Sequence, residues 1–258
     1  MNKKNDFSQK MHSYLRHPAS LIMMILVKLA ALITFTVLIF LIIYILVHGV
    51  PYLKPSLFSL HYNSENASLM PALINTVIMT LLSLLLAVPI GIFSAIFLAE
   101  YAGKGNKFVD IIRLTTETLS GIPSIVYGLF GMLFFVSTCH WGFSLLAGAF
   151  TLAIMILPLI MRTTEEALLS VPDSYREGSF GLGAGKLRTV FYIVLPSAVP
   201  GILAGVILAI GRIVGETAAL IYTAGSVAQV PSSVLGSGRT LAVHMYLLAS
   251  EGLYMDQA

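Results

Sequence analysis

The chain has 258 residues, of which 57% are hydrophobic and 10% are charged, and its formal net charge is +3. Soluble domains contain roughly 25% charged residues, so this composition excludes an ordinary soluble protein and is typical of a membrane protein. The single cysteine, Cys139, excludes an internal disulfide.

Five apolar stretches predict transmembrane helices, because about 20 apolar residues cross the hydrocarbon core. Four are clear, and the fifth is long enough but contains Arg212 and Glu216. They comprise residues 20–47, 72–99, 119–138, 141–161 and 189–224. The first is too long for a cleaved signal peptide and lacks the small-residue cleavage site. We therefore predict an all-α polytopic membrane protein, with residues 20–258 as its transmembrane domain.

The segment 1–19 precedes the first span and is predicted to be cytoplasmic. Its larger side chains share one helical face, which favours an interfacial helix on the inner leaflet. A disordered basic tail is an equal alternative. These side chains are Phe7, Met11, Tyr14, Leu15 and Pro18.

Two spans contain prolines that disturb a helix. Pro89 predicts a kink in the second span, because proline removes a backbone donor. In the third, Gly121, Ile122 and Pro123 fit a helix break that lines a cavity, and they also fit the first turn of a helix.

The basic residues predict the orientation, since they are retained on the cytoplasmic side. Eleven of the fifteen Lys and Arg residues fall in the N-terminal segment and in alternate loops, whereas the opposite loops hold Lys54 and Arg239. The eleven are Lys3, Lys4, Lys10, Arg16, Lys104, Lys107, Arg113, Arg162, Arg176, Lys186 and Arg188. We therefore expect the N-terminus and the loop 162–196 to be cytoplasmic. Five spans leave the C-terminus outside, because the last apolar stretch, 241–249, is too short to cross.

The loop 162–196 contains signals for a short, well-delimited helix. Ser174 and Glu177 have the spacing of a capping box, which predicts that the helix begins there. Gly183 can adopt the left-handed conformation that ends it. Gly178, Ser179 and Gly181 then offer a small-residue surface to a partner. Leu195 and Pro196 mark the predicted return to the membrane.

The glycine-rich run from Gly181 to Lys186 is not a phosphate-binding loop. That motif needs a glycine where Phe180 stands and a hydroxyl residue where Leu187 stands. ATP hydrolysis therefore belongs to a partner, and the chain itself is not expected to be an enzyme or to bind a cofactor.

The fifth span contains charges that are costly in a membrane and therefore suggest function or pairing. Arg212 and Glu216 are four residues apart, so a continuous helix would place them on one face. In one interpretation they pair and fix a helix interface. In the other, Arg212 lies on a translocation pathway and helps an anion across, since guanidinium matches phosphate oxygens. Two G-x3-G pairs, 201/205 and 211/215, predict close helix packing.

The spacing of Glu177, Gly178, Ser179, Gly183 and Ile193–Pro196 resembles the EAA loop of bacterial ABC-importer permeases. In that family the loop docks into the ATPase subunit. The resemblance implies a type I importer permease fold and ATPase coupling through Glu177, Gly178, Ser179, Gly183, Leu195 and Pro196. The family usually has a sixth helix, so we expect this chain to be truncated relative to it.

Further stretches are similar to phosphate-import permeases, and to the PstA subunit more than to PstC. They are 121–131, 171–177, Arg212–Leu220 including Glu216 and Thr217, and 236–244. The resemblance implies an inorganic phosphate pathway in the bacterial cytoplasmic membrane, with Arg212, Glu216 and Thr217 as its pathway residues. It also implies three partners, namely a PstC-like permease subunit, two copies of a PstB-like ATPase that uses ATP and Mg, and an external PstS-like phosphate-binding protein.

Alternatives remain open at this stage. The chain fits an ABC permease for another oxyanion or small solute, and less well a secondary transporter, which would show repeated halves. Arg239 and His244 are expected to be exposed outside the membrane, with contact to phosphate or the binding protein as the alternative. His48, His61 and His140 lack metal-ligand spacing, and no nucleic-acid partner is expected.

Overall fold

The structure is a computed structural model that describes residues 18–63, 66–102 and 105–252, and these residues form helices and loops without a strand. The chain divides into two compact units, residues 1–53 and 54–258. The predicted interfacial helix before residue 18 lies outside the described residues.

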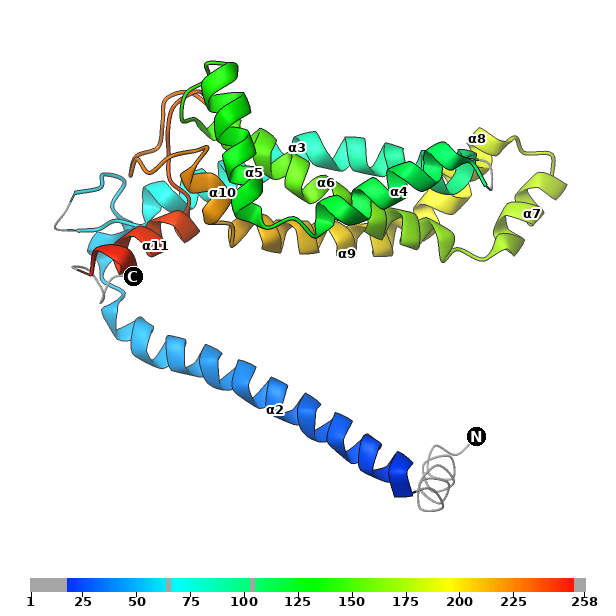
Figure 1. Cartoon of the computed structure of the whole chain (residues 1–258), viewed down its shortest axis with the longest axis horizontal. Coiled ribbons are helices and arrows are strands. Elements are labelled where there is room, and N and C mark those ends of the chain that lie inside the picture. The colour runs from blue at the N-terminus through cyan, green and yellow to red at the C-terminus, as the bar shows by residue number, and fades with distance from the viewer. Residues whose placement is uncertain (1–17, 64–65, 103–104, 253–258) are drawn as a thin grey trace. The chain divides into compact units, whose positions relative to one another are not determined.

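Ten α-helices and five helical turns of the 3-10 or π type occur in the described residues (Figure 1). The α-helices are α2 (Pro18–Gly49), α3 (Met70–Ile96), α4 (Lys107–Ser120), α5 (Ser124–Gly131), α6 (Leu145–Leu169), α7 (Asp173–Gly181), α8 (Lys186–Thr189), α9 (Leu195–Val214), α10 (Ala218–Ile221) and α11 (Leu241–Glu251). The turns are the 3-10 helices η1 (Val50–Tyr52) and η2 (Pro55–Phe58) and the π-helices η3 (Phe97–Tyr101), η4 (Met132–Thr138) and η5 (Val190–Val194).

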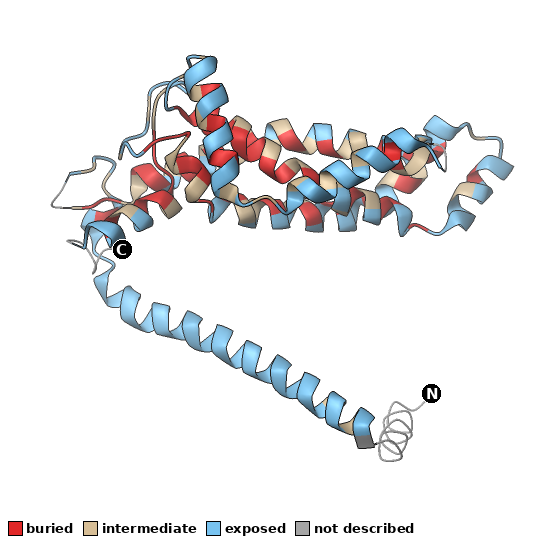
Figure 2. Ribbon diagram, viewed as in Figure 1, coloured by how far each residue is buried: buried red, intermediate tan, exposed pale blue. Residues whose placement is uncertain are grey.

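In the described part of the first unit, the helical elements are α2 and η1. Every described side chain of α2 except those of Leu21 and Met24 is exposed, and Figure 2 shows nearly the whole helix in the exposed colour. A helix that is apolar on all sides fits a lipid environment or the surface of another membrane protein. This agrees with the predicted span 20–47.

In the second unit, α3, α6 and α9 run side by side, with α6 between the other two (Figure 1). The buried side chains lie along their contacts, among them Met79, Ile156 and Ile213 (Figure 2). The α7 and α8 helices lie at one end of this bundle, which we call the α7 end. At the opposite end, the α10 end, lie α10 and α11 (Figure 1).

Small residues bring these helices close together. A Cβ added to Gly201 of α9 would lie 2.7 Å from the Cβ of Ala167 on α6, so the first predicted G-x3-G pair is a packing contact. Gly211 has no atom within 4 Å of such a Cβ, so the second pair does not serve the same purpose.

Four helical stretches are long and apolar enough to span a membrane: Ala19–Tyr52, Met70–Tyr101, Leu145–Leu169 and Lys186–Val214. The third predicted span, 119–138, covers only the second half of a bent helix pair. The two halves of this pair, Lys107–Ser120 and Ser124–Thr138, meet at 101°. The break is at Gly121–Pro123, so this sequence both ends α4 and begins α5. Counting the bent pair as one span gives five.

Candidate functional site

The helix α7 begins two residues earlier than the capping box predicted, because the box makes Ser174 the N-cap. Its first residue is Asp173, and Pro172 is the N-cap, which makes no side-chain capping bond. Proline fixes φ near the helical value, here −57°, and the extended ψ of 137° turns the chain into the helix. The prediction of Ser174 as the cap was therefore wrong. The negative charge of Asp173 in the first turn still interacts favourably with the helix dipole.

The end of α7 is a Schellman motif built on Gly183. The Ala184 amide donates to the Ser179 carbonyl at 3.1 Å, and the Gly183 amide donates to the Phe180 carbonyl at 2.9 Å. Gly183 has a φ of +81°, the left-handed conformation that was predicted for it. The helix is thus closed at its end by backbone geometry.

Two faces of α7 have different surroundings. Ser179 is buried, and its hydroxyl lies 2.8 Å from that of Thr189 on α8. It therefore faces the bundle and is not part of the exposed surface that we expected. Glu177 and Gly178 are exposed, as that surface requires.

Large apolar side chains join Glu177 and Gly178 on the exposed side. Tyr175, Phe180 and Leu182 are all exposed, and Leu182 reaches 91%. Apolar side chains exposed on this short helix are available for contact with a partner. The EAA pattern did not predict these residues, because only its small residues indicate a partner surface. We call the exposed surface of Tyr175, Glu177, Gly178, Phe180 and Leu182 the α7 face.

The segment after α7 becomes helical before Leu195 and Pro196, where the return to the membrane was predicted. The helical stretch that contains α8, η5 and α9 begins at Lys186, so Leu195 and Pro196 lie inside it. Pro196 stands at the start of α9, directly after the π-turn η5. A wider turn is a common accommodation where a proline cannot donate its hydrogen bond.

Arg212 and Glu216 do not share a helical face, because α9 ends between them at Val214. Glu216 is 8% exposed and its Oε1 accepts a hydrogen bond of 3.1 Å from the Ala219 amide, so it caps the first turn of α10. Thr217 is the N-cap residue of α10 and makes no side-chain capping bond. No ion pair joins Arg212 to Glu216 or to any other carboxylate of residues 18–63, 66–102 and 105–252. The pairing interpretation was therefore wrong.

Arg212 lies in the last turn of α9, near the break between α4 and α5. Its charge is close enough to act electrostatically on the Tyr127 phenol. The Tyr127 hydroxyl donates to the Leu119 carbonyl at 2.8 Å and so holds the break together. A Cβ at Gly128 would lie 2.8 Å from the Cα of Ala219, so α5 and α10 are in close contact. Two interrupted helical segments thus meet beside a guanidinium group.

Arg239 and His244 are buried, contrary to the expectation that they are exposed. Arg239 is 6% exposed and its guanidinium lies 4.7 Å from the centre of the Tyr62 ring, while His244 is fully buried against the edge of that ring. Burial and the nearby Arg239 charge lower the pKa of His244 to about 4. We call Tyr62, Arg239 and His244 the aromatic–basic cluster.

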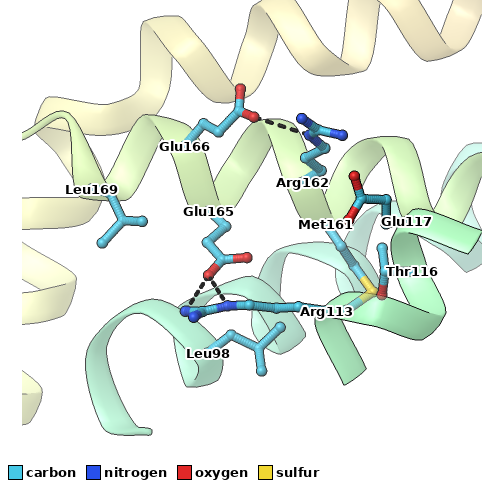
Figure 3. Close-up of a pocket in the computed structure, with 9 residues that line it drawn as sticks. All are labelled: Leu98, Arg113, Thr116, Glu117, Met161, Arg162, Glu165, Glu166 and Leu169. Carbon is cyan, nitrogen blue, oxygen red and sulfur yellow. Dashed lines mark hydrogen bonds and ion pairs between the residues drawn. The ribbon is translucent and has the colours of Figure 1, made fainter. Parts of the chain in front are cut away.

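A cleft of about 320 Å³ lies between α4 and α6, towards the α7 end (Figure 3). Arg113 pairs with Glu165 at 2.6 Å, and Arg162 pairs with Glu166 at 3.1 Å. Each arginine of the cleft is thus already engaged by a carboxylate, and Glu117 adds a further negative charge (Figure 3). The cleft therefore does not offer an anion the open guanidinium that Arg212 does.

Comparisons with known proteins agree with this architecture. Residues 87–250 match the family model described as binding-protein-dependent transport system inner membrane component. The chain is 35% identical over 243 residues to the probable ABC transporter permease protein YqgI of Bacillus subtilis, covering 88% of this chain and 82% of that protein.

It is also 39% identical to the phosphate transport system permease protein PstA of Haemophilus influenzae, over 68% of this chain and 62% of that protein. PstA 2 of Mycobacterium bovis is 40% identical over 62% of this chain and 53% of that protein. Our chain thus spans less than two thirds of the length of these two phosphate permeases.

Among solved structures, an inward-facing form of the MetNI methionine ABC transporter aligns with a TM-score of 0.50 and 19% identity. The alignment covers 73% of this chain and 89% of that one. At this identity the likeness shows a shared fold.

Proposed function

Because this chain belongs to the binding-protein-dependent transport system inner membrane component family, we propose that it is the PstA-type permease subunit of an ATP-driven phosphate importer. The chain is a multi-pass inner-membrane transport subunit, not an enzyme, and its family works with an ATPase and a substrate-binding partner. Family membership also argues against a secondary transporter.

The guanidinium group of Arg212, unpaired among the described residues, is the main observation that supports phosphate as the substrate. A guanidinium group near the end of a membrane helix, with no carboxylate partner in the described part of the chain, keeps its planar set of donors free for an oxyanion. A charge at such a position is costly unless it serves a purpose. The relatives named as phosphate permeases support the same choice. We propose that Arg212 contacts phosphate on the pathway. Glu216 and Thr217 shape the turn that presents it.

The partners follow from the same proposal. A PstC-like permease completes the membrane pathway, two copies of a PstB-like ATPase bind ATP and Mg, and a PstS-like protein delivers phosphate. The α7 face, with Gly183 fixing the end of its helix, docks on the ATPase. The charge asymmetry of the loops supports an orientation with the N-terminus and α7 in the cytoplasm. In this orientation Arg212 lies towards the outer side and receives the delivered anion.

An ABC permease for another oxyanion is the second candidate. The Bacillus relative that covers most of this chain is named as a permease without a substrate, and a guanidinium binds any tetrahedral oxyanion of similar charge. Competition by arsenate, sulfate and molybdate in the uptake assay separates these substrates.

Uptake of radiolabelled phosphate tests the proposal in cells that lack their own high-affinity importer. The cells carry the partner subunits with this chain as wild type, as Arg212→Gln, or as Arg162→Gln as the control. Arg162 matches Arg212 in charge but already has a carboxylate partner. We expect wild type and control to take up phosphate. In Arg212→Gln the uptake rate should fall at least ten-fold, while the complex still assembles and hydrolyses ATP. An assembled wild-type complex that moves no phosphate would refute the substrate assignment.

A further inference from the structure

The guanidinium of Arg176 joins α7 to two other segments of the bundle. Its Nε and Nη2 donate to the same oxygen of Glu100 on η3, at 3.1 and 2.7 Å. Nη2 also donates to the Leu168 carbonyl at 2.9 Å, and Nη1 donates to the Val171 carbonyl at 2.8 Å and to Asp173 at 3.1 Å. An arginine has five N–H donors, and these five bonds use all of them.

Three of the four acceptor residues belong to elements that meet at the α7 end, and the fourth, Val171, lies in the connection between α6 and α7. Glu100 lies in η3, the π-helical continuation of α3. Leu168 is in the last turn of α6, where carbonyls have no partner within the helix. Asp173 is the first residue of α7. One side chain therefore connects the ends of α3 and α6 to the start of α7, although Glu100 is 76 residues away in sequence.

Burial makes this connection stiff. The side chains of Arg176 and Glu100 are 15% and 8% exposed, so water competes little for their bonds. The Arg162–Glu166 pair is the opposite case, with side chains 60% and 65% exposed. Screening weakens an exposed pair much more than a buried one.

Neighbouring contacts hold the same junction. The Lys186 ammonium, at the start of α8, lies 5.0 Å from the centre of the Tyr101 ring, and Tyr101 follows Glu100. The Ser179–Thr189 hydroxyl contact links α7 to α8. The η3 end of α3 is thus held by Arg176 within α7 and by Lys186 after it.

We propose that Arg176 is a positioning residue for transport, and that its bond to Glu100 is the joint through which α7 carries α3 along with α6. The chain connects α7 directly to α6 and α8 but not to α3, so a push on the α7 face reaches α3 through noncovalent contacts such as this one. This inference rests on the proposed docking of α7 on the ATPase. It adds that the junction moves as one body during the ATP cycle.

Proteoliposomes with the whole importer test this joint, by measuring phosphate transported per ATP hydrolysed. We expect the ratio to fall about ten-fold in Arg176→Gln and Glu100→Gln, with ATPase activity retained, and to stay unchanged in Arg162→Gln. Arg176→Lys keeps the charge but lacks the planar guanidinium group, so its transport ratio should lie between those of wild type and Arg176→Gln. Unchanged ratios in both joint variants would overturn the proposal.

A distance measurement gives a readout that does not depend on phosphate transport. Spin labels are placed at the exposed Ser174 of α7 and Phe97 of η3, in a chain with Cys139→Ser. With the joint intact, we expect one narrow distance distribution that is the same before and after nucleotide trapping in the complex. In Arg176→Gln the distribution should broaden or shift on trapping.

These two measurements separate the inference from the proposed function. If the intact chain shows a shift on trapping as large as that of Arg176→Gln, the joint is refuted, whatever solute is transported. If the intact distribution is constant but no phosphate moves, the joint stands and the phosphate assignment fails.

Discussion

Arg212 and Glu216 are four residues apart, yet Glu216 bonds to the Ala219 amide at 3.1 Å and not to Arg212. The end of α9 at Val214 turns the chain, so the carboxylate serves α10 while the guanidinium stays at the end of α9. Because the two residues have different roles, we expect their substitutions to have different effects.

Replacing Glu216 should therefore affect stability in a way that depends on its hydrogen bond and not on its charge. Glu216→Gln keeps an oxygen that accepts from Ala219, so we expect near-normal thermal stability of the detergent-solubilised protein. Glu216→Ala removes the cap and should cost about 1 kcal/mol. Thermal unfolding of both variants measures the difference. Equal destabilisation by the two, matching that of Arg212→Gln, would instead indicate an ion pair.

Gly183 and Gly181 form a matched pair for testing the Schellman motif. A Cβ at either position would have no atom within 4 Å, but only Gly183 has a positive φ, +81°. Gly183→Ala should destabilise α7 by about 1–2 kcal/mol because of the left-handed backbone. Gly181→Ala should stabilise it by about 0.5–1 kcal/mol, since alanine is the better helix former. Hydrogen exchange of the α7 amides measures both changes in helix stability. Similar protection in the two variants would argue against the motif.

The α7 face should contribute to ATPase binding through its apolar side chains. Leu182 is 91% exposed, and its burial against a partner is worth about 2 kcal/mol, so Leu182→Ser should weaken association about 30-fold. Leu60→Ser is the control, since Leu60 is also exposed but lies in the loop before α3. Pull-down of the ATPase at graded concentrations measures both variants. Equal affinity of the two would place the docking surface elsewhere.

The sequence predicted the apolar spans well because burial in lipid depends on composition, which a single sequence shows directly. It ended the fourth span at Met161, whereas α6 continues to Leu169. The extra turns contain Arg162, Glu165 and Glu166, whose charges suggested a loop. They remain helical because each is paired, within α6 or with Arg113 on α4.

Most of α4 was not predicted, for a related reason. Its charged residues, among them Asp110, Arg113 and Glu117, dilute the apolar signal over Lys107–Ser120, so the predicted span began only at residue 119. An amphipathic helix shows in periodicity rather than in mean hydropathy.

Contacts between residues far apart in the chain could not be predicted from the sequence. The Arg176–Glu100 and Tyr62–Arg239 contacts depend on which elements meet at each end of the bundle. The residues of the EAA-like pattern were found because their spacing is local, whereas the inward face of Ser179 depends on the packing of α7 against α8.

The aromatic–basic cluster should make the α10 end sensitive to acid. The pKa of His244 is lowered from 6.5 to about 4, chiefly by burial and then by the Arg239 charge. Above pH 6.5 the imidazole is neutral in both the folded and the unfolded protein and has no effect. As the pH falls from 6.5 to 4, the unfolded state takes up a proton that the folded state does not, so stability is lost and then levels off. The full loss is about 3 kcal/mol.

Hydrogen exchange of the α11 amides and thermal unfolding, both between pH 7 and pH 4, test this expectation. His244→Gln cannot be protonated in this range, so it should remove most of the pH dependence, whereas His61→Gln, at an exposed histidine, should leave it as in wild type. Because Arg239 and Tyr62 face His244, Arg239→Gln should also reduce the acid sensitivity, by removing the charge that opposes protonation. A wild-type protein whose α11 protection is constant from pH 7 to pH 4 would show that His244 accepts a proton in the folded state as readily as in the unfolded one.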